Sequence, residues 1–145
     1  MATIALSSDG SQLIAAVTSD RNSLWQVDEG QRLVDLTRHS GAVNHVRVNP
    51  QGDRLVSVGE AGTLRLWVLP TGQLLHTWTA KTGLRAVVLN TVEPAVVTGD
   101  RRGSVRLWSL TDFDQHQQLG QHQDAVSAIA LSPNGRWLAT GSRDG

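Results

Sequence analysis

Five histidines are the side chains of this sequence best suited to bind a metal or to act as a general base. They are spread along the chain, as His39, His45, His76, His116 and His122. No two of them have the spacing of a zinc site, and neither a Cys nor a cluster of carboxylates accompanies them. We therefore expect no metal and no other cofactor.

The patterns of nucleophilic and phosphate-binding chemistry are missing as well. Serine is abundant, yet no Gly-x-Ser-x-Gly sequence is present to place a serine on a nucleophile turn. The segments GTLRLW and GSVRLW lack the Gly-Lys-Ser/Thr sequence and the following helix of a phosphate-binding loop. We expect no enzymatic activity.

Composition and hydropathy argue against a nucleic-acid or membrane partner. Lys and Arg number 13, as do Asp and Glu, so the formal net charge is zero and no global field favours nucleic acid or an anionic membrane. No apolar run approaches the ~20 residues of a membrane span. The segment MATIALSSDG lacks the basic start and apolar centre of a signal peptide. These features favour a cytoplasmic protein, although the lack of Cys leaves the compartment open.

The elements that position these residues come from an internal repeat. The chain has five Trp but one Phe and no Tyr, which suggests that one position is reused. The segments SLWQV, RLWVL and RLWSL place Trp25, Trp67 and Trp108 at spacings of 42 and 41 residues. The turns SSDG (7–10), NPQG (49–52) and SPNG (132–135) recur at the same offsets. The sequence thus contains four units of 41–42 residues.

Each complete unit is expected to supply four short strands. In 43–48 the apolar Val43, Val46 and Val48 have polar residues between them, and in 64–69 Leu64, Leu66 and Val68 alternate with Arg65, Trp67 and Leu69. Gly, Pro, Asn and Asp turns bound these segments. In the second unit we expect strands at 43–49, 53–59, 63–69 and 73–79, and almost no helix anywhere. Sequential antiparallel strands repeated at this period are typical of propeller blades.

Two segments resemble the repeats of the WD-repeat β-propeller family, namely HSGAVNHVRVNPQGDRLVSVGEAGTLRLW (39–67) and HQDAVSAIALSPNGRWLATGSRDG (122–145). The resemblance covers essentially the whole chain. It implies an all-β propeller segment of four-stranded antiparallel blades, with 14 strands and an incomplete ring. The single propeller region 1–145 divides into blade 1 (2–39), blade 2 (40–80), blade 3 (81–122) and a partial blade 4 (123–145).

The resemblance also implies a structural tie within each blade, made by a hydrogen-bonded set of His, Ser or Thr, Asp and Trp. The residues that fall on these positions are Trp25; His39, Ser57 and Trp67; Thr98 and Trp108; and His122, Thr140 and Asp144. Only Asp144 supplies the Asp, because Ser19, Ala61 and Arg102 occupy that position elsewhere. We expect His39 to find water or a backbone carbonyl instead, and blades 2 and 3 to depend more on apolar packing than on the ties.

Protein partners of this family often dock on the face formed by the loops that lead into the inner strand and by the turn between the second and third strands. By register, the main candidates here are Asn44, Glu60, Arg85, Arg101, Ser127 and Arg143, beside Ala42, Gly83 and Ala125. Arg85, Arg101 and Arg143 are either ordinary solvated surface residues, which is the interpretation we favour from the sequence, or a basic crescent suited to carboxylate or phosphate.

The resemblance therefore predicts a non-catalytic scaffold for protein–protein interaction, within a larger propeller or multidomain protein. The alternative is a ligand-binding or enzymatic propeller with a site in the central channel, although inner-strand positions such as His45 and Arg47 offer few groups for it. We also expect the chain to be a fragment of a longer propeller rather than half of a discrete dimer. The partner's identity does not follow from the sequence, because variable loops carry specificity.

Overall fold

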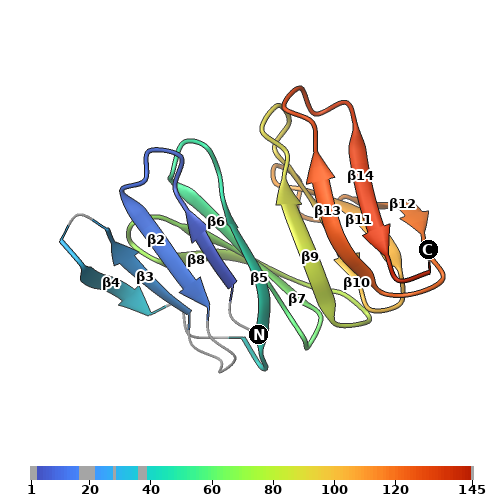
Figure 1. Ribbon diagram of the computed structural model, residues 1–145, viewed down its shortest axis with the longest axis horizontal. Helices are drawn as coiled ribbons and strands as arrows, with labels where there is room; N and C mark the ends of the chain where they lie inside the picture. Colours follow the sequence, from blue (N-terminus) through green and yellow to red (C-terminus); the bar gives the residue numbers. More distant parts are fainter. Residues whose placement is uncertain (1–2, 17–21, 28, 36–38, 145) are drawn as a thin grey trace.

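The computed structural model describes residues 3–16, 22–27, 29–35 and 39–144, and within them the chain forms fourteen strands in four antiparallel sheets (Figure 1). No helix occurs in these residues, so none of them forms a helix that could cross a membrane. The first eight strands are β1 (Thr3–Leu6), β2 (Gln12–Ala16), β3 (Asn22–Gln26), β4 (Gln31–Asp35), β5 (Val43–Val48), β6 (Arg54–Gly59), β7 (Thr63–Val68) and β8 (Gln73–Thr79). The remaining six are β9 (Leu84–Leu89), β10 (Ala95–Asp100), β11 (Ser104–Ser109), β12 (His116–Gln121), β13 (Val126–Leu131) and β14 (Leu138–Ser142).

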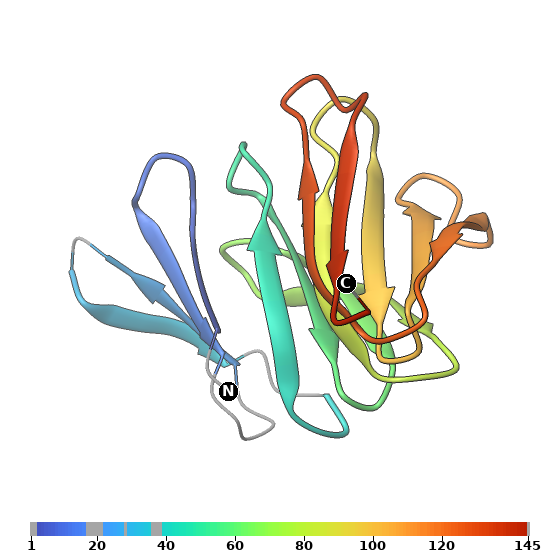
Figure 2. The same cartoon turned by 45° about the vertical axis from the view of Figure 1, so that its right-hand side comes forward.

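Each sheet is a meander in which consecutive strands are neighbours. The orders are β1-β2-β3-β4, β5-β6-β7-β8, β9-β10-β11-β12 and β13-β14, and we call these sheets blades 1 to 4. The blades stand side by side like the segments of a fan (Figure 2). The four strands expected within 43–79 are present, each with boundaries within one residue of the prediction.

Tight turns that need glycine join the second and third strands of blades 2 and 3. Gly62 and Gly103 have φ values of 78° and 85°, in the left-handed region that glycine occupies at little cost. A Cβ on Gly62 would lie 2.6 Å from the Ala80 carbonyl oxygen. The close approach of the next loop therefore also requires glycine here, which explains why the turn recurs 41 residues later.

The core lies between blades rather than within one blade. The inner strands β1, β5, β9 and β13 pack against one another in sequence. Between blades 2 and 3, the largest cluster of buried side chains includes Val56, Val58, Leu64, Leu66, Trp78, Leu84, Val87, Leu89, Val96 and Trp108. Because each apolar face is buried by its neighbour, the stack is stabilised by contacts between adjacent repeats.

Blades 1 and 4, at the two ends of the stack, expose apolar side chains. On β1, Ile4 and Leu6 are 63% and 60% exposed, and Trp137, just before β14, is 76% exposed. The described residues form no closed ring. Trp78, by contrast, is buried as a cover between blades 2 and 3, and its indole N–H donates to the Phe113 carbonyl oxygen at 2.9 Å.

Candidate partner-binding face

Blade 2 contains a continuous chain of buried polar side chains. The Trp67 indole N–H donates to Ser57 Oγ at 2.9 Å, and Ser57 Oγ lies 2.7 Å from His39 Nε2. The other ring nitrogen, His39 Nδ1, lies 2.6 Å from Thr63 Oγ1. A neutral imidazole can satisfy both contacts, because one of its nitrogens donates while the other accepts.

The expectation that His39 would form a hydrogen bond with water or a backbone carbonyl is therefore wrong. Thr63 is the first residue of β7, two positions beyond Ala61, and its hydroxyl reaches the nitrogen that an Asp would otherwise hold. A hydroxyl residue at the start of a third strand is the sequence signal that could have indicated this substitute. Whether blade 2 depends more on packing than on the tie stays a prediction, but its tie has all the partners it needs.

Burial makes His39 a neutral side chain. Its residue is 4% exposed, and desolvation lowers its pKa from 6.5 to about 4, with a smaller contribution from the positive charge of Arg65. The imidazole is consequently uncharged near pH 7 and acts as a structural hydrogen-bonding group.

Blade 3 has a shorter tie. The Trp108 indole N–H donates to Thr98 Oγ1 at 2.8 Å, and both residues are buried. The turn between β10 and β11 is held instead by Asp100, which the repeat register does not indicate: its Oδ1 accepts from the backbone N–H groups of Arg102 at 2.9 Å and Ser104 at 2.8 Å. The acid thus comes two positions before the register places it, as the last residue of β10.

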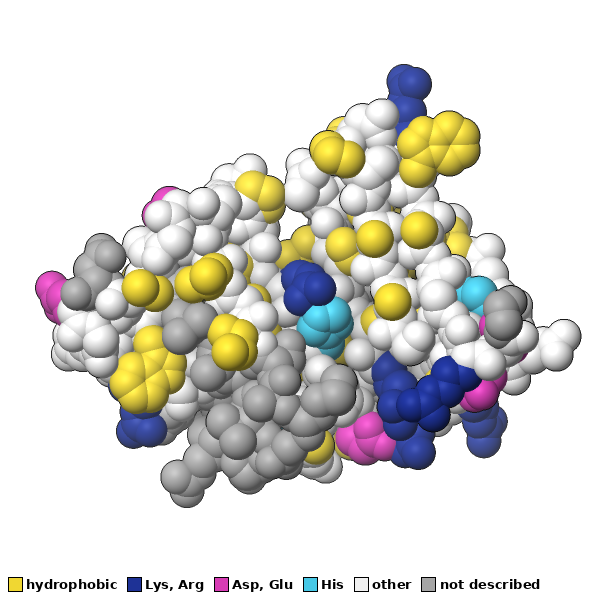
Figure 3. All heavy atoms as spheres, in the orientation of Figure 1, with side chains coloured by type: hydrophobic (Ala, Val, Ile, Leu, Met, Phe, Trp, Pro, Cys, Tyr) yellow, Lys and Arg dark blue, Asp and Glu magenta, His cyan; other side chains and the backbone are white. Residues whose placement is uncertain are grey.

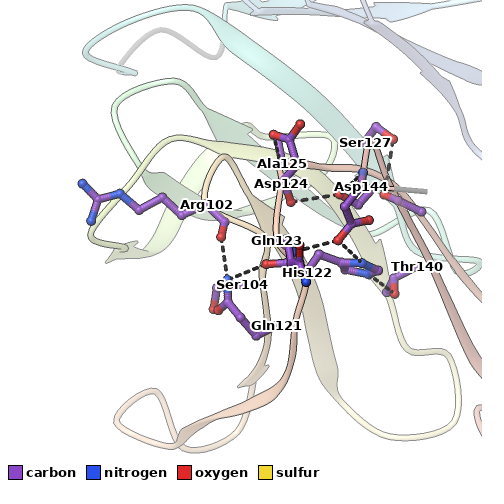
Figure 4. Close-up of polar contacts among 12 residues, drawn as sticks. Arg102, Ser104, Gln121, His122, Gln123, Asp124, Ala125, Ser127, Thr140 and Asp144 are labelled. Atoms are coloured by element: carbon purple, nitrogen blue, oxygen red, sulfur yellow. Dashed lines mark hydrogen bonds and ion pairs between the residues drawn. The ribbon is translucent and has the colours of Figure 1, made fainter.

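In blade 4 the His, Thr and Asp positions lie together (Figure 4). His122 Nε2 is 2.8 Å from Thr140 Oγ1, and His122 Nδ1 is 3.4 Å from Asp144 Oδ2. The Gln123 N–H donates to the same carboxylate at 2.7 Å, and this bond is the main reason why the pKa of Asp144 is below its ordinary value. In blade 1, Trp25 is half-buried, while Ser19 lies outside the described residues.

The three arginines of the predicted crescent line one hollow. Arg85 follows the loop into blade 3, Arg101 lies in the turn after β10, and Arg143 follows β14. The hollow has a volume of about 210 Å³ and is completed by Asp124, Ala125 and Ser127. Figure 3 shows a group of basic side chains, with acidic side chains beside them, at the lower right edge of the molecule.

Three of the predicted contact residues, Asn44, Glu60 and Arg101, make contacts between adjacent blades. The Asn44 amide group donates to Glu60 Oε2 at 2.8 Å and to the Leu84 carbonyl oxygen at 2.7 Å. Glu60 also forms an ion pair with Arg101. Asn44 is half-buried, and Gly83 is buried rather than exposed, because the neighbouring blade packs closely at this point.

Because Arg101 is paired with Glu60, Arg85 and Arg143 are the arginines of the hollow whose charge is not used in an ion pair among the described residues. Both are exposed, and no carboxylate among the described residues forms an ion pair with either. An Arg guanidinium presents several donors in a rigid plane, which suits bidentate binding of carboxylate or phosphate. The hollow can therefore attract an anionic group at the rim of blades 3 and 4.

The inner strand β5 carries two ionisable residues that could serve a central-channel site. His45 Nδ1 accepts from the Val87 N–H at 3.3 Å, and burial lowers the pKa of His45 to about 4, with a further contribution from Arg47. Arg47 donates to the Val46 carbonyl oxygen. Within the described ranges, no three His, Asp or Glu side chains are grouped so that they could hold a metal ion.

Radial four-stranded sheets with indole-to-hydroxyl ties at the same place in successive sheets define this chain as a β-propeller segment. Residues 30–68 and 113–145 match the family described as WD domain, G-beta repeat. The chain belongs to the WD-repeat family.

Several proteins are similar to this chain. It is 30% identical over 142 residues to Autophagy-related protein 16 of Arabidopsis thaliana, a match that covers 97% of this chain and 28% of that protein. It is 29% identical to an uncharacterized WD repeat-containing protein of Synechocystis, over 99% of this chain and 54% of that protein. Eukaryotic translation initiation factor 3 subunit I of Drosophila willistoni is 22% identical, over 85% of this chain and 43% of that protein. The chain thus spans between about a quarter and about half of the length of these relatives.

Proposed function

We propose that this chain is a non-catalytic cytoplasmic scaffold that binds a protein partner through the hollow formed by Arg85, Arg101 and Arg143. The observation that carries the proposal is the convergence on one hollow of three arginines, two from blade 3 and one from blade 4. Two of them, Arg85 and Arg143, form no ion pair with an acidic residue among the described residues. The partner is expected to present carboxylate or phosphate groups there. One relative is by its name a subunit of a larger factor, which supports a role within an assembly.

We further propose that the chain works as part of a larger propeller or multidomain protein. The greater length of the relatives supports this view. In such a protein the other blades would cover the apolar side chains that β1 and the segment before β14 expose here.

Charge reversal of the exposed arginines tests the proposal. The double variant Arg85→Glu and Arg143→Glu should lose the proteins that the wild-type chain captures from cells of its source, as measured by quantitative mass spectrometry. It should also lose binding of a short acidic peptide, whose binding to the wild type should weaken as salt is added. The matched control is Arg136→Glu, an exposed arginine in the loop at the opposite end of β13 and β14.

The control variant should keep the partners, because its charge change lies away from the hollow. Circular dichroism should show that both variants retain the strand content of the wild type. Capture of the same partners by the double variant would show that the arginine hollow is not the binding site.

A further inference from the structure

A second hollow lies at the other end of the blades, between blades 2 and 3. It has a volume of about 450 Å³, within the range of small ligand clefts of ~300–1,000 Å³. The loop between β5 and β6 forms one wall, and the loop between β9 and β10 forms the other. Both loops lie at the upper edge of the molecule in Figure 1, whereas the turns after β6 and β10 lie at the lower edge.

The hollow, which we call the interblade groove, has an apolar floor and exposed apolar side chains on its rim. Leu66 and Leu89 are buried beneath it, and Phe113 is half-buried. On its rim, Leu75 and Val92 are 40% and 62% exposed. Covering such side chains is favourable by roughly 25 cal/mol per Å² of apolar surface removed from water. The groove therefore favours an apolar occupant.

Hydrogen bonds and ring contacts hold the walls in place. The Phe113 carbonyl oxygen accepts from the Trp78 indole, and the Phe113 ring stacks on His76 with centroids 4.2 Å apart. Across the groove, Asn90 Oδ1 accepts from the backbone N–H groups of Val92 at 2.9 Å and Glu93 at 3.3 Å. An occupant would not have to order these loops, so little of its binding free energy would be lost to reorganisation.

The charges on the two walls are unequal. Arg54 is paired with its neighbour Asp53, with Nη1 and Oδ2 3.3 Å apart. Glu93, on the opposite wall, is exposed, and no cation among the described residues forms an ion pair with it. The groove thus offers an uncompensated carboxylate beside an apolar floor.

From this combination we propose that the interblade groove binds a short extended segment of a protein partner, in which a large apolar side chain lies next to a Lys or Arg. The apolar side chain fills the space above Leu66 and Phe113, and the basic residue pairs with Glu93. This site is separate from the arginine hollow, which prefers acidic groups and lies at the opposite end of the strands. The two ends of the blades therefore select partners of opposite charge.

The test uses three short peptides with blocked ends, titrated into the chain by calorimetry. The first carries a central Leu-Phe-Arg, the second replaces Arg with Glu, and the third replaces Leu-Phe with Ser-Ser. The first should bind about tenfold more tightly than either of the others. Glu93→Lys should invert the preference between the first two peptides, and Val92→Ser should weaken binding of the first about fivefold.

Two control variants distinguish the interblade groove from the rest of the surface. Leu119→Ser removes an apolar side chain that is 42% exposed on β12, outside the groove, and should leave peptide binding unchanged. The double variant Arg85→Glu and Arg143→Glu should also bind the first peptide as the wild type does, so failure of the arginine hollow would leave this result unaffected.

Three results would overturn the proposal. The first is equal binding of all three peptides, or no binding at a peptide concentration of about 1 mM. The second is a loss of binding in Leu119→Ser as large as in Val92→Ser. The third is self-association of the wild-type chain that Val92→Ser abolishes, because the groove would then be an interface between two copies.

Discussion

Mild acid should destabilise this fold through His39. In the folded chain the pKa of His39 is about 4, whereas an unperturbed histidine has the value 6.5. Between these values the unfolded chain binds a proton that the folded chain does not, so the free energy of unfolding falls as the pH falls from about 6.5 to about 4. This contribution to stability is fully present above pH 6.5 and is lost progressively below it.

The magnitude follows from the two pKa values. Linkage of one proton gives a loss of about 2 kcal/mol between pH 7.5 and pH 5.0, and about 3 kcal/mol once the pH is below both values. His45 has the same direction of shift, so the wild-type chain should lose more than His39 alone accounts for. A variant in which only position 39 no longer titrates gives the part of this loss of unfolding free energy that is due to His39.

His39→Gln is that variant, because an amide retains a donor and an acceptor near Ser57 and Thr63 but does not titrate. Urea unfolding at pH 7.5 and pH 5.0, followed by both Trp fluorescence and circular dichroism, gives the free energy of unfolding of each protein. The drop between the two pH values should be about 2 kcal/mol smaller in the variant than in the wild type. An identical drop in both proteins would refute the assignment of a buried neutral imidazole to His39.

Two further predictions concern the tie of blade 3 and the glycine turns. A double-mutant cycle of Thr98→Val and Trp108→Phe, measured by urea unfolding, should give a coupling free energy of about 1 kcal/mol, because the pair shares one buried hydrogen bond; a coupling near zero would contradict this. Gly103→Ala should lower the thermal midpoint more than Gly10→Ala. Both glycines have positive φ, 85° and 73°, but only at Gly103 would the added Cβ meet the His122 carbonyl oxygen, since nothing lies within 4 Å at Gly10. Equal losses of thermal stability would show that the contact is relieved at no cost.

The strands of this protein could be predicted because their signals are local. Alternating apolar residues indicate the strands, and turns such as NPQG and SPNG mark where one strand ends and the next begins, without reference to distant residues. The repeated Trp of RLWVL and RLWSL identifies the third strand of blades 2 and 3. Sequential antiparallel strands joined by tight turns are neighbours, so the order of the strands in each sheet follows from their order in the sequence. That is why the boundaries expected within 43–79 agree with the structure to within one residue.

The polar contacts could be predicted only in part, because a register position specifies a backbone site and not the reach of a side chain. The repeat places the acidic residue at positions 61 and 102. The hydrogen bonds near these positions are instead made by Thr63, two residues later, and by Asp100, two residues earlier. Asn44 was expected to face a partner, yet its amide spans the gap to Leu84 of the next blade. Such exchanges depend on distances of a few ångströms between blades, which the sequence pattern does not specify.

By itself, then, the sequence determined the all-β class, the strand order and the family, since these follow from periodicity along the chain. Only the tertiary structure decided which surface groups are available for binding. Glu60 and Arg101 are 41 residues apart and neutralise each other across two blades, whereas Glu93 and Arg85 are left without an ion-pair partner among the described residues. The physical reason is that the free charge and open apolar surface of a repeat protein depend on how neighbouring repeats pack, and this packing joins side chains that are distant in the sequence.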